Sequence, residues 1–573
     1  SAIFFAKLYP IPLPPPVIMI TLFSIEKISS IFNLLKVVIK FKSKNSLINL
    51  LFIAFIQKCI MKDRILFWLD SGLIYYGIAY FLNQKHDCEM YSIIETHEKP
   101  RKFYENQKLT PFKKIWFFHD YVSTQNKEPD LKYLSSIEKK YGINIWLIAY
   151  AERFFAQQSE YHKFTRNEIL SLIEQECKLF EQVLDEINPN FLIMRDVDMH
   201  HVNLLHQICK ARGIKILSLF PAKMGSKWIV SDTDRLTIEP INLKNIPKNN
   251  RSFNDLQNYL KKFNQKDWVD KYISSSKINF LNKRTLSSIF NLFFIQNKED
   301  RKKFMSIGRS KSKVFVVMLS LLLKRKYRQL FLDRHSKMEI KNDEKFVYFP
   351  LHVSPERYVD ISAPFFSNQL EVIRNIARSI PVDYKLYVKE HYAMVTRYWR
   401  KIPFYKEILA LPNVELIHTS LSSEEIIKKS SLVITITGTS ALQAAFYEKP
   451  SIVMSHVMYL EFLPFIRRIK NLEELPYAIR SALKSKVDLT DLNRFVEILE
   501  KESFDFKSHI FNNEYNPIFN TLTSNVEISE SQMKSFLDHN RETFELLVFE
   551  HLKKIKQGDS KYAVTNEKKE KSV

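Results

Sequence analysis

Short apolar runs of strand length alternate with helical patterns from residue 61 onward, and this alternation constrains the fold more than any other feature of the chain. Helical periodicity is clearest at Asn167–Ile187 and at His201–Ala211, and the second pattern ends at Gly213, a residue suited to closing a helix. Strand-like runs stand at 64–69, Met90–Glu95, Ile115–His119, Ile143–Ala149, Phe191–Arg195 and Ile214–Leu219. Strands that alternate with helices predict a parallel, doubly wound sheet.

A second alternating block begins at Lys345. Its expected strands are Lys345–Phe349, Tyr384–Val388, Val414–Ile417, Leu432–Thr437 and Ser451–Met454, and its expected helices are Ser367–Ser379, Ser423–Lys429 and Ser440–Tyr447. We therefore predict an α/β chain with two Rossmann-like domains, at 61–240 and at 346–490. A basic helical insertion is expected at 241–345, closing helices at 491–556 and a disordered tail at 557–573.

Residues 1–60 differ in character from the rest of the chain. They lack glycine, and five prolines between residues 10 and 16 prevent an early helix. One interpretation is a leader that lies on a membrane surface, with its lysines at anionic headgroups. The other, which we favour, is that Met61 is the true start and that 1–60 is a non-native upstream extension.

The net charge of +23 lies mostly outside the two expected domains. Residues 241–345 carry 25 Lys and Arg against nine Asp and Glu. Enzymes that act on nucleic acid usually carry such charge in their working domains, so nucleic acid is not an expected partner. Within this segment, the apolar run Val314–Leu323 precedes the basic run Lys324–Arg328. Such a helix either lies at an anionic membrane surface or docks on the two domains with its lysines in water.

Cysteine content and hydropathy exclude two classes of protein. The four cysteines lie far apart without a CxxC pair, which excludes a disulfide scaffold and a Cys-rich zinc site and suits a reducing compartment. No uncharged apolar run reaches the ~20 residues that a membrane-spanning helix needs, which argues against a channel or transporter. We expect a cytoplasmic protein, with peripheral contact to the inner face of the cell membrane as an open alternative.

The segment from Ser431 to Ala445 is the strongest candidate for a ligand site. A buried strand leads into Thr437, Gly438, Thr439 and Ser440, and a helix follows. Gly438 permits a tight turn, and the helix N-terminus with its neighbouring hydroxyl groups suits an anion such as a nucleotide diphosphate. Gln443, one turn further on, can reach a ribose or a base. The alternative is an ordinary strand–turn–helix unit with Ser and Thr as caps.

Two more polar clusters follow strands of the second block. Lys389, Glu390 and His391 end one strand, and His352 and Glu356 follow another. Ligands of doubly wound sheets lie outside the carboxyl ends of the strands, so these residues are expected on the same edge as Gly438. Lys389 or His391 can neutralise phosphate, and Glu390 can orient either of them.

The first domain offers candidates for a general base after the strand that ends at Met194. Asp196, Asp198 and His200 stand in this segment, and Asp70 ends another strand of the same sheet. Their spacing matches no standard zinc motif, so no metal ligands are assigned. We expect one of them to act as a base, and the alternative is helix capping by the aspartates.

Taken together, three motifs resemble those of bacterial and archaeal capsular polysaccharide biosynthesis proteins: Phe349–His352 with Pro355–Glu356, Tyr387–His391, and Val433–Thr439 with Lys449–Pro450. That family is similar to two-domain GT-B glycosyltransferases, including transferases that use CMP-activated Kdo. The resemblance is strongest over about 345–456 and weaker over 61–235. It differs at His391-Tyr392, where the family commonly has His-Pro, and at Gln443, where it commonly has Glu.

The resemblance implies a glycosyltransferase of surface polysaccharide synthesis, in which His391 and the Gly438 loop contact the phosphates of a nucleotide sugar. The donor is a substrate, and neither a metal nor another cofactor is expected. The acceptor would be a glycan or a lipid-linked glycan that approaches the first domain. Two alternatives stay open: a sugar-nucleotide 2-epimerase, and a non-catalytic partner in polysaccharide assembly or export.

Overall fold

The computed structural model describes residues 62–569 apart from 71, 124–127, 157–160, 233–249, 262–306, 342, 355–356, 396–399, 458, 461 and 509–526. The chain divides into two units, residues 1–62 and 63–573, and the second unit holds both sheets. The expected leader at 1–60 and the expected start at Met61 lie outside the described residues, as does most of the basic insertion.

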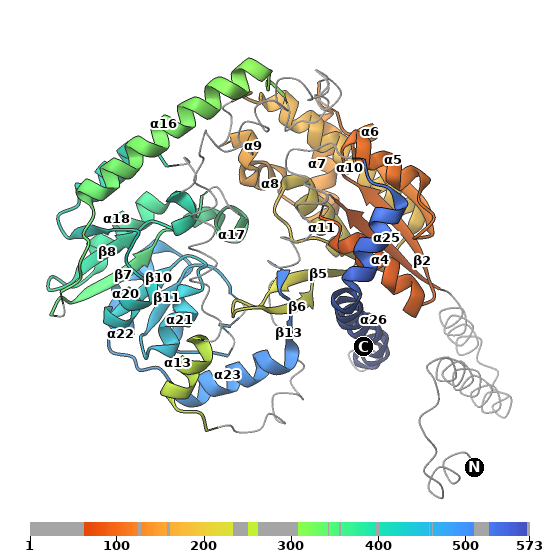
Figure 1. Ribbon diagram of the computed structural model, residues 1–573. Helices are drawn as coiled ribbons and strands as arrows, with labels where there is room; N and C mark the ends of the chain where they lie inside the picture. The colour runs from red at the N-terminus through yellow and green to blue at the C-terminus, as the bar shows by residue number, and fades with distance from the viewer. Residues whose placement is uncertain are drawn as a thin grey trace, which may run out of the picture. The chain divides into compact units, whose positions relative to one another are not determined.

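The first sheet has seven strands in the order β13-β6-β5-β4-β1-β2-β3 (Figure 1). Their bounds are β1 Asp63–Leu69, β2 Cys88–Ile94, β3 Phe112–Phe117, β4 Phe191–Met194, β5 Lys215–Pro221, β6 Lys227–Ser231 and β13 Phe504–Asp505. The strands from β3 to β5 are parallel, whereas β6 and β13 add antiparallel neighbours at one side. The order β3-β2-β1-β4-β5 is that of the Rossmann fold.

Both faces of this sheet are covered by helices, which explains why its strands read as continuous apolar runs. Leu66 and Trp68 join a core with α10 (Arg166–Ile187) and α11 (His200–Ala211), and Ile65 and Phe67 join another with α4 (Ile74–Lys85) and α26 (Arg541–Lys569). Helices α4 and α26 come so close that a Cβ on Gly77 would lie 2.0 Å from the Phe544 ring. The other helices of this part are α5 (Glu98–Asn106), α6 (Phe118–Tyr121), α7 (Leu131–Tyr141), α8 (Ile145–Ala151), α9 (Arg153–Ala156) and α25 (Glu530–His539).

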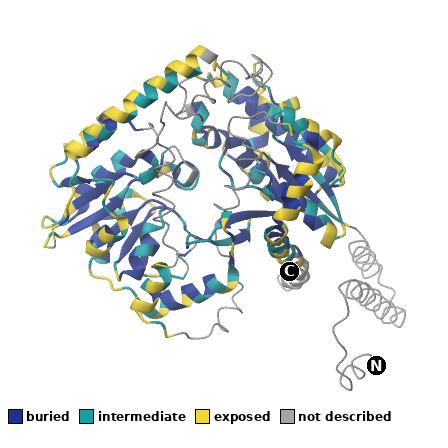
Figure 2. Ribbon diagram, viewed as in Figure 1, coloured by how far each residue is buried: buried dark blue, intermediate teal, exposed yellow. Residues whose placement is uncertain are grey.

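The second sheet has six parallel strands in the order β12-β11-β10-β7-β8-β9. Their bounds are β7 Phe346–Pro350, β8 Lys385–Lys389, β9 Val414–Ile417, β10 Leu432–Thr435, β11 Ser451–Val453 and β12 Ile466–Arg468. The main helices of this part are α13 (Phe253–Lys261), α16 (Lys311–His335), α17 (Arg357–Asp360), α18 (Gln369–Ser379), α19 (Ile402–Leu409), α20 (Ser423–Lys429), α21 (Ser440–Phe446), α22 (Leu475–Ala482) and α23 (Leu489–Glu502). Figure 2 shows the strands of both sheets as the buried layer beneath these helices. Read from β9, this is again the Rossmann order.

The predicted fold class, an α/β chain with two Rossmann-like sheets, is thus confirmed. Each sheet has a switch point, where the strand order reverses: between β1 and β4 in the first, and between β7 and β10 in the second. Loops that follow these four strands meet at the carboxyl edge of their sheet, which is where ligands of such folds bind.

One predicted strand is wrong. Residues 143–149 were expected as a strand, but Ile145–Ala151 forms α8, and the Asn144 side chain caps it by accepting a hydrogen bond from the Leu147 N–H at 2.9 Å. Burial of Ile145, Ile148 and Ala149 follows helical spacing. A continuous apolar run carries no visible period, so the sequence pattern could not separate the two alternatives.

The C-terminal part also departs from expectation. Beside the helices expected there, β13 pairs with β6, and α26 packs against α4 of the first sheet (Figure 1). The helix α26 continues to Lys569, where a disordered tail was expected from residue 557. That stretch lacks proline and has one glycine, so nothing in it breaks a helix that tertiary contacts have already begun. Within the described ranges, no helix is both long and apolar enough to cross a bilayer.

Candidate functional site

At the switch point of the second sheet, a histidine from one loop is bound to the loop that follows the neighbouring strand. His352 lies just after β7, and its Nε2 is 3.0 Å from Thr435 Oγ1, at the end of β10. The same Nε2 accepts a hydrogen bond from the Thr437 N–H at 3.2 Å. His352 and the Thr437–Gly438 turn, which the sequence pattern placed on one edge, are therefore in direct contact.

These contacts fix the protonation of His352. Thr435 Oγ1 accepts a hydrogen bond from the Gly438 N–H at 3.1 Å, so its own proton points to His352 Nε2. Burial, reinforced by the nearby His391 and Arg400, lowers the pKa of His352 to about 3. The ring is therefore neutral with its proton on Nδ1. Nδ1 is buried and makes no hydrogen bond within the described part of the chain, so it offers an N–H to a ligand.

Gly438 is required for close packing in this turn. Its φ does not lie in the left-handed region, but a Cβ there would lie 2.6 Å from Thr435 Oγ1 and 3.3 Å from His352 Nε2. From the sequence, Gly438 was expected in a tight turn against a ligand. A side chain would first meet the Thr435–His352 pair, because that pair already occupies the space.

Glu390 is used to hold the site together. Its carboxylate accepts hydrogen bonds from the His391 N–H at 2.6 Å, from the Tyr405 hydroxyl at 2.5 Å and from Arg400. Arg400 also donates to the carbonyl of His352, which fixes the loop after β7. Glu390 was expected to orient Lys389 or His391: its buried carboxylate holds the backbone of His391, whereas Lys389 donates to Leu421 and Ser423 instead.

Lys389 is a buried cation at the end of β8. Its Nζ donates to the Leu421 carbonyl at 2.6 Å and to Ser423 Oγ at 3.0 Å, and no carboxylate of the described residues pairs with it. Burial lowers the pKa of Lys389 to about 8. A buried positive charge that lacks a carboxylate partner favours an anionic ligand nearby.

The remaining candidate residues at this edge differ in how far they are buried and hydrogen-bonded, and so in how freely they could contact a ligand. Ser440 Oγ is buried without a hydrogen-bond partner in the described part of the chain, and Gln443 is half-buried. Thr439 is the N-cap of α21 but makes no side-chain cap. His391 is half-buried, with its Nδ1 accepting from the Ala393 N–H at 3.2 Å. Glu356 lies outside the described residues.

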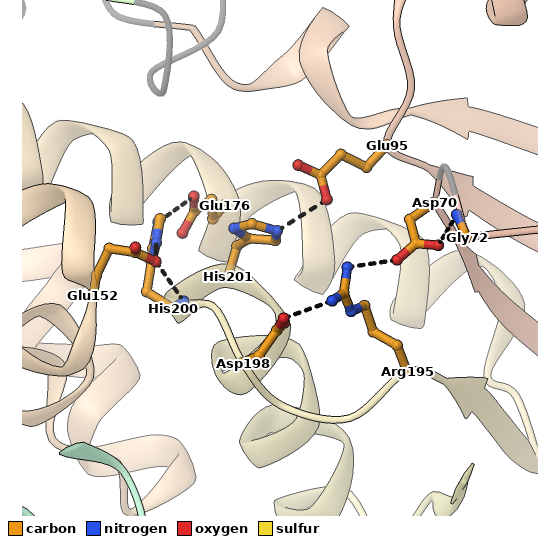
Figure 3. A network of polar contacts seen from close by, with 9 residues as sticks. All are labelled: Asp70, Gly72, Glu95, Glu152, Glu176, Arg195, Asp198, His200 and His201. Atoms are coloured by element: carbon orange, nitrogen blue, oxygen red, sulfur yellow. Dashed lines mark hydrogen bonds and ion pairs between the residues drawn. The ribbon is translucent and has the colours of Figure 1, made fainter. Parts of the chain in front are cut away.

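The first sheet has an ion-pair chain at its own switch point, shown in Figure 3. Arg195, after β4, donates through Nη1 to Asp70 at 2.6 Å and through Nη2 to Asp198 at 2.5 Å. Asp70 also accepts from the Gly72 N–H at 2.7 Å. Burial raises the pKa of Asp198 although Arg195 acts in the opposite direction, and Asp198 Oδ1 is buried without a partner in the described part of the chain. Asp196 has a buried Oδ1 in the same loop.

His200 lies deeper, between two glutamates. Its Nδ1 is 2.9 Å from Glu152 and its Nε2 is 2.9 Å from Glu176, and all three side chains are buried. Burial alone would lower the pKa of His200, but the two carboxylates outweigh it and raise the value to about 10. The expectation of a general base at His200 is therefore corrected, because neither ring nitrogen is available to take a proton from a substrate.

Several residues of these networks were missed in the sequence: Glu95, Glu152, Glu176, Arg400 and Tyr405. His201 Nε2 lies 3.2 Å from Glu95, which follows β2, more than a hundred positions earlier. Only Glu176 left a local signal, since it falls on the apolar face of a helix, where a charged residue needs a buried partner.

One family of known proteins matches the part of the chain that holds most of the second sheet. Residues 254–460 match the family described as "Capsule polysaccharide biosynthesis protein". The match begins at 254 and so includes part of the basic insertion, which the sequence resemblance had left aside. Among curated proteins, none matches the chain in sequence.

Solved structures of two kinds resemble the chain. KpsC from Thermosulfurimonas dismutans, a beta Kdo 2,7 transferase, is 11% identical over 58% of this chain and 81% of its own, with a TM-score of 0.26. UDP-GlcNAc 2-epimerase from Methanocaldococcus jannaschii is 14% identical over 77% of this chain and 100% of its own, with a TM-score of 0.21. The enzyme from Neisseria meningitidis, bound to UDP-GlcNAc, is 12% identical over 77% and 99%, with a TM-score of 0.24. These likenesses concern the fold and carry no argument about activity.

The family match coincides with the part of the chain that carries His352, Lys389 and the Gly438 turn. The resemblance seen in its motifs is therefore confirmed. Residues 254–460, about a third of the chain, thus match the capsule polysaccharide biosynthesis family.

Proposed function

We propose that the protein is a glycosyltransferase of surface polysaccharide synthesis that binds a nucleotide-sugar donor at the switch point of its second sheet. The observation that carries this proposal is the set of unsatisfied donors there. His352 Nδ1 and Ser440 Oγ are buried and have no partner in the described part of the chain, and Lys389 is a buried cation without a carboxylate. Buried donors without acceptors are costly, and a ligand rich in acceptor oxygens removes that cost.

A nucleotide diphosphate is the ligand class that fits these groups. Hydroxyls of Thr437 and Thr439 stand beside Ser440 in the same turn, and Gln443 presents an amide one helical turn later. Donors and one cation near a diphosphate would stabilise the charge of the departing nucleotide, which is how such sites accelerate transfer without a metal. His391 is proposed as a further phosphate contact, as the family resemblance implies.

For the base we propose Asp198 ahead of Asp196 and Asp70. One of its oxygens is held by Arg195 while the other is buried without a partner in the described part of the chain, and its pKa is raised. A carboxylate that is held in place and whose pKa is raised toward neutrality suits proton abstraction from an acceptor hydroxyl. Asp70 pairs with the same arginine and also accepts a hydrogen bond from the Gly72 N–H, so both of its oxygens already have a partner and it is less suited to take a proton.

We also propose that α16 contacts an anionic membrane, where a lipid-linked acceptor would be found. Five of its apolar side chains are 44–67% exposed and recur at helical spacing: Val316, Leu319, Leu323, Tyr327 and Leu330. Basic residues stand at both ends of the apolar run, Lys311 and Lys313 before it and Lys324–Lys326 after Leu323, and Asp333 is the one acidic residue of the helix. An apolar stripe flanked by lysines binds at the interface of an anionic bilayer.

The experiment is an assay of the full chain against a panel of nucleotide sugars, with and without a glycan or lipid-linked acceptor. Transfer that requires acceptor supports the proposal. Conversion of the donor alone identifies an epimerase, and binding without turnover identifies an assembly partner. Calorimetric titration of Ser440→Ala should show nucleotide binding weakened by about 2- to 12-fold, the value of one neutral hydrogen bond.

The matched control is Ser430→Ala. Ser430 is buried and its hydroxyl donates to the Ile427 carbonyl at 2.8 Å, before β10 and away from the turn. It should leave nucleotide affinity unchanged. Equal affinity of both variants and the parent would place the donor site elsewhere.

A further inference from the structure

We propose that Glu176, His200 and His201 form a buried site for a divalent transition-metal ion of the Zn²⁺ type, within the first sheet's core. One ligand atom from each of these residues lies within 4.8 Å of the others, and all three residues are fully buried. The site is separate from the proposed donor site and does not depend on the proposed function.

The three residues supply a familiar donor set. Two imidazoles and one carboxylate are borderline ligands that suit Zn²⁺ and its first-row neighbours, and they leave a fourth position open. In this structure Glu176 Oε1 lies 2.9 Å from His200 Nε2. Bonds of about 2.0–2.2 Å to a common ion would hold tetrahedral ligand atoms roughly 3.4 Å apart, so side-chain shifts of about 1 Å are enough to enclose it.

Both histidines are backed by a carboxylate on the side away from Glu176. His200 Nδ1 pairs with Glu152 at 2.9 Å, and His201 Nε2 pairs with Glu95 at 3.2 Å. Figure 3 shows the second ring nitrogen of His201 turned toward Glu176. This is the outer arrangement of metal-binding histidines, in which a carboxylate fixes the tautomer and strengthens the ligand.

An independent observation points to a missing charge. Glu176 Oε2 is buried and has no hydrogen-bond partner within the described part of the chain. Three carboxylates gather around two imidazoles here, and Glu152 and Glu176 are at most 2% exposed. Burying carboxylates without full compensation costs several kcal/mol per ion. A divalent cation between Glu176 and the two histidines supplies that compensation and gives Oε2 a partner.

The site joins segments that are distant in sequence. Glu176 lies in the middle of α10 and the two histidines open α11, while Glu152 follows α8 and Glu95 follows β2. A metal ion here would therefore hold together the helices on one face of the first sheet.

The test measures the metal content of the full chain. The protein is purified without chelators and analysed by inductively coupled plasma mass spectrometry, then unfolded with chelator and refolded with or without Zn²⁺. We expect one tightly held ion per chain after refolding with Zn²⁺. X-ray absorption should show two imidazole nitrogens and carboxylate oxygen around the metal, with no sulfur. A chain that takes up no ion on refolding would overturn the proposal and leave His200 as a protonated link between two glutamates.

Variants separate the site from general effects on the core. Glu176→Gln keeps the shape of the side chain, removes its charge and should abolish binding. Glu152→Gln should weaken binding by about 10- to 100-fold, as expected of an outer partner.

Glu174→Gln is the matched control, since Glu174 is buried on the same helix but pairs with Lys178 and the Asp130 N–H. Equal metal content of Glu176→Gln and Glu174→Gln would overturn the assignment. If Glu176→Gln does not fold, the metal content and absorption spectrum of the parent chain still decide.

Discussion

Replacing Gly438 with alanine tests the central contact of the second sheet. The new methyl group would lie 2.6 Å from Thr435 Oγ1, closer than such atoms approach, and 3.3 Å from His352 Nε2. The buried Thr435 side chain must then turn its hydroxyl away. That movement breaks the hydrogen bond from the Gly438 N–H, at 3.1 Å, and the contact with His352, at 3.0 Å.

Those two bonds set the magnitude of the effect. Each is worth about 0.5–1.5 kcal/mol net, and a buried group left without a partner costs about 1–3 kcal/mol. We therefore expect Gly438→Ala to lower the free energy of unfolding by about 2–4 kcal/mol, measured by urea denaturation of the full chain. Nucleotide affinity should fall as well, because His352 loses one of the two donors, Thr435 Oγ1 and the Thr437 N–H, that keep its proton on Nδ1.

A double-mutant cycle isolates the cause. Thr435→Ala removes the hydroxyl, so Gly438→Ala added to it meets only Ser440 Oγ at 3.1 Å and His352 Nε2 at 3.3 Å and should cost less than about 1 kcal/mol. The coupling energy between the two substitutions is then about 1–3 kcal/mol. If Gly438→Ala costs the same in both backgrounds, or nothing in either, the close approach does not explain this glycine. A loss of stability with unchanged nucleotide affinity would keep the packing argument and refute the proposed donor site.

Three further outcomes are expected. Nucleotide-sugar affinity should fall as pH rises through about 8, because Lys389, whose pKa is lowered to about 8, loses its positive charge there; calorimetry at several pH values should show this step in the parent and not in Lys389→Gln. Glu390→Gln should cost about 3–5 kcal/mol in urea denaturation, because it leaves the buried Arg400 guanidinium without its carboxylate, and a loss below 1 kcal/mol would contradict that pairing. Leu323→Glu should weaken co-sedimentation with anionic vesicles in low salt, whereas Val382→Glu, at an exposed site outside α16, should not; equal binding of both variants would refute the membrane contact.

The local elements and the ends of the strands could be predicted from the order of residues alone. Alternating periods placed β1, β4, β7 and β10 correctly, because burial on both faces of a parallel sheet leaves an apolar run that is visible in the chain. Caps were also local: Gly213 closes α11 in the left-handed conformation, as expected. Polar residues after the strands were therefore rightly expected at the carboxyl edges of the sheets.

The partners of those polar residues depend on tertiary packing. The strand order places the loop after β7 against the loop after β10. The hydrogen bonds of His352 therefore join residues that lie 83–85 positions apart in the sequence. Glu390 is hydrogen-bonded to Arg400 and Tyr405, and His200 to Glu152 and Glu176. A buried charge needs such partners, and tertiary packing decides which residues provide them. The periodicity of the sequence shows which face of a helix or strand is buried. Which residue that face contacts is decided only when the segments pack together in the folded chain.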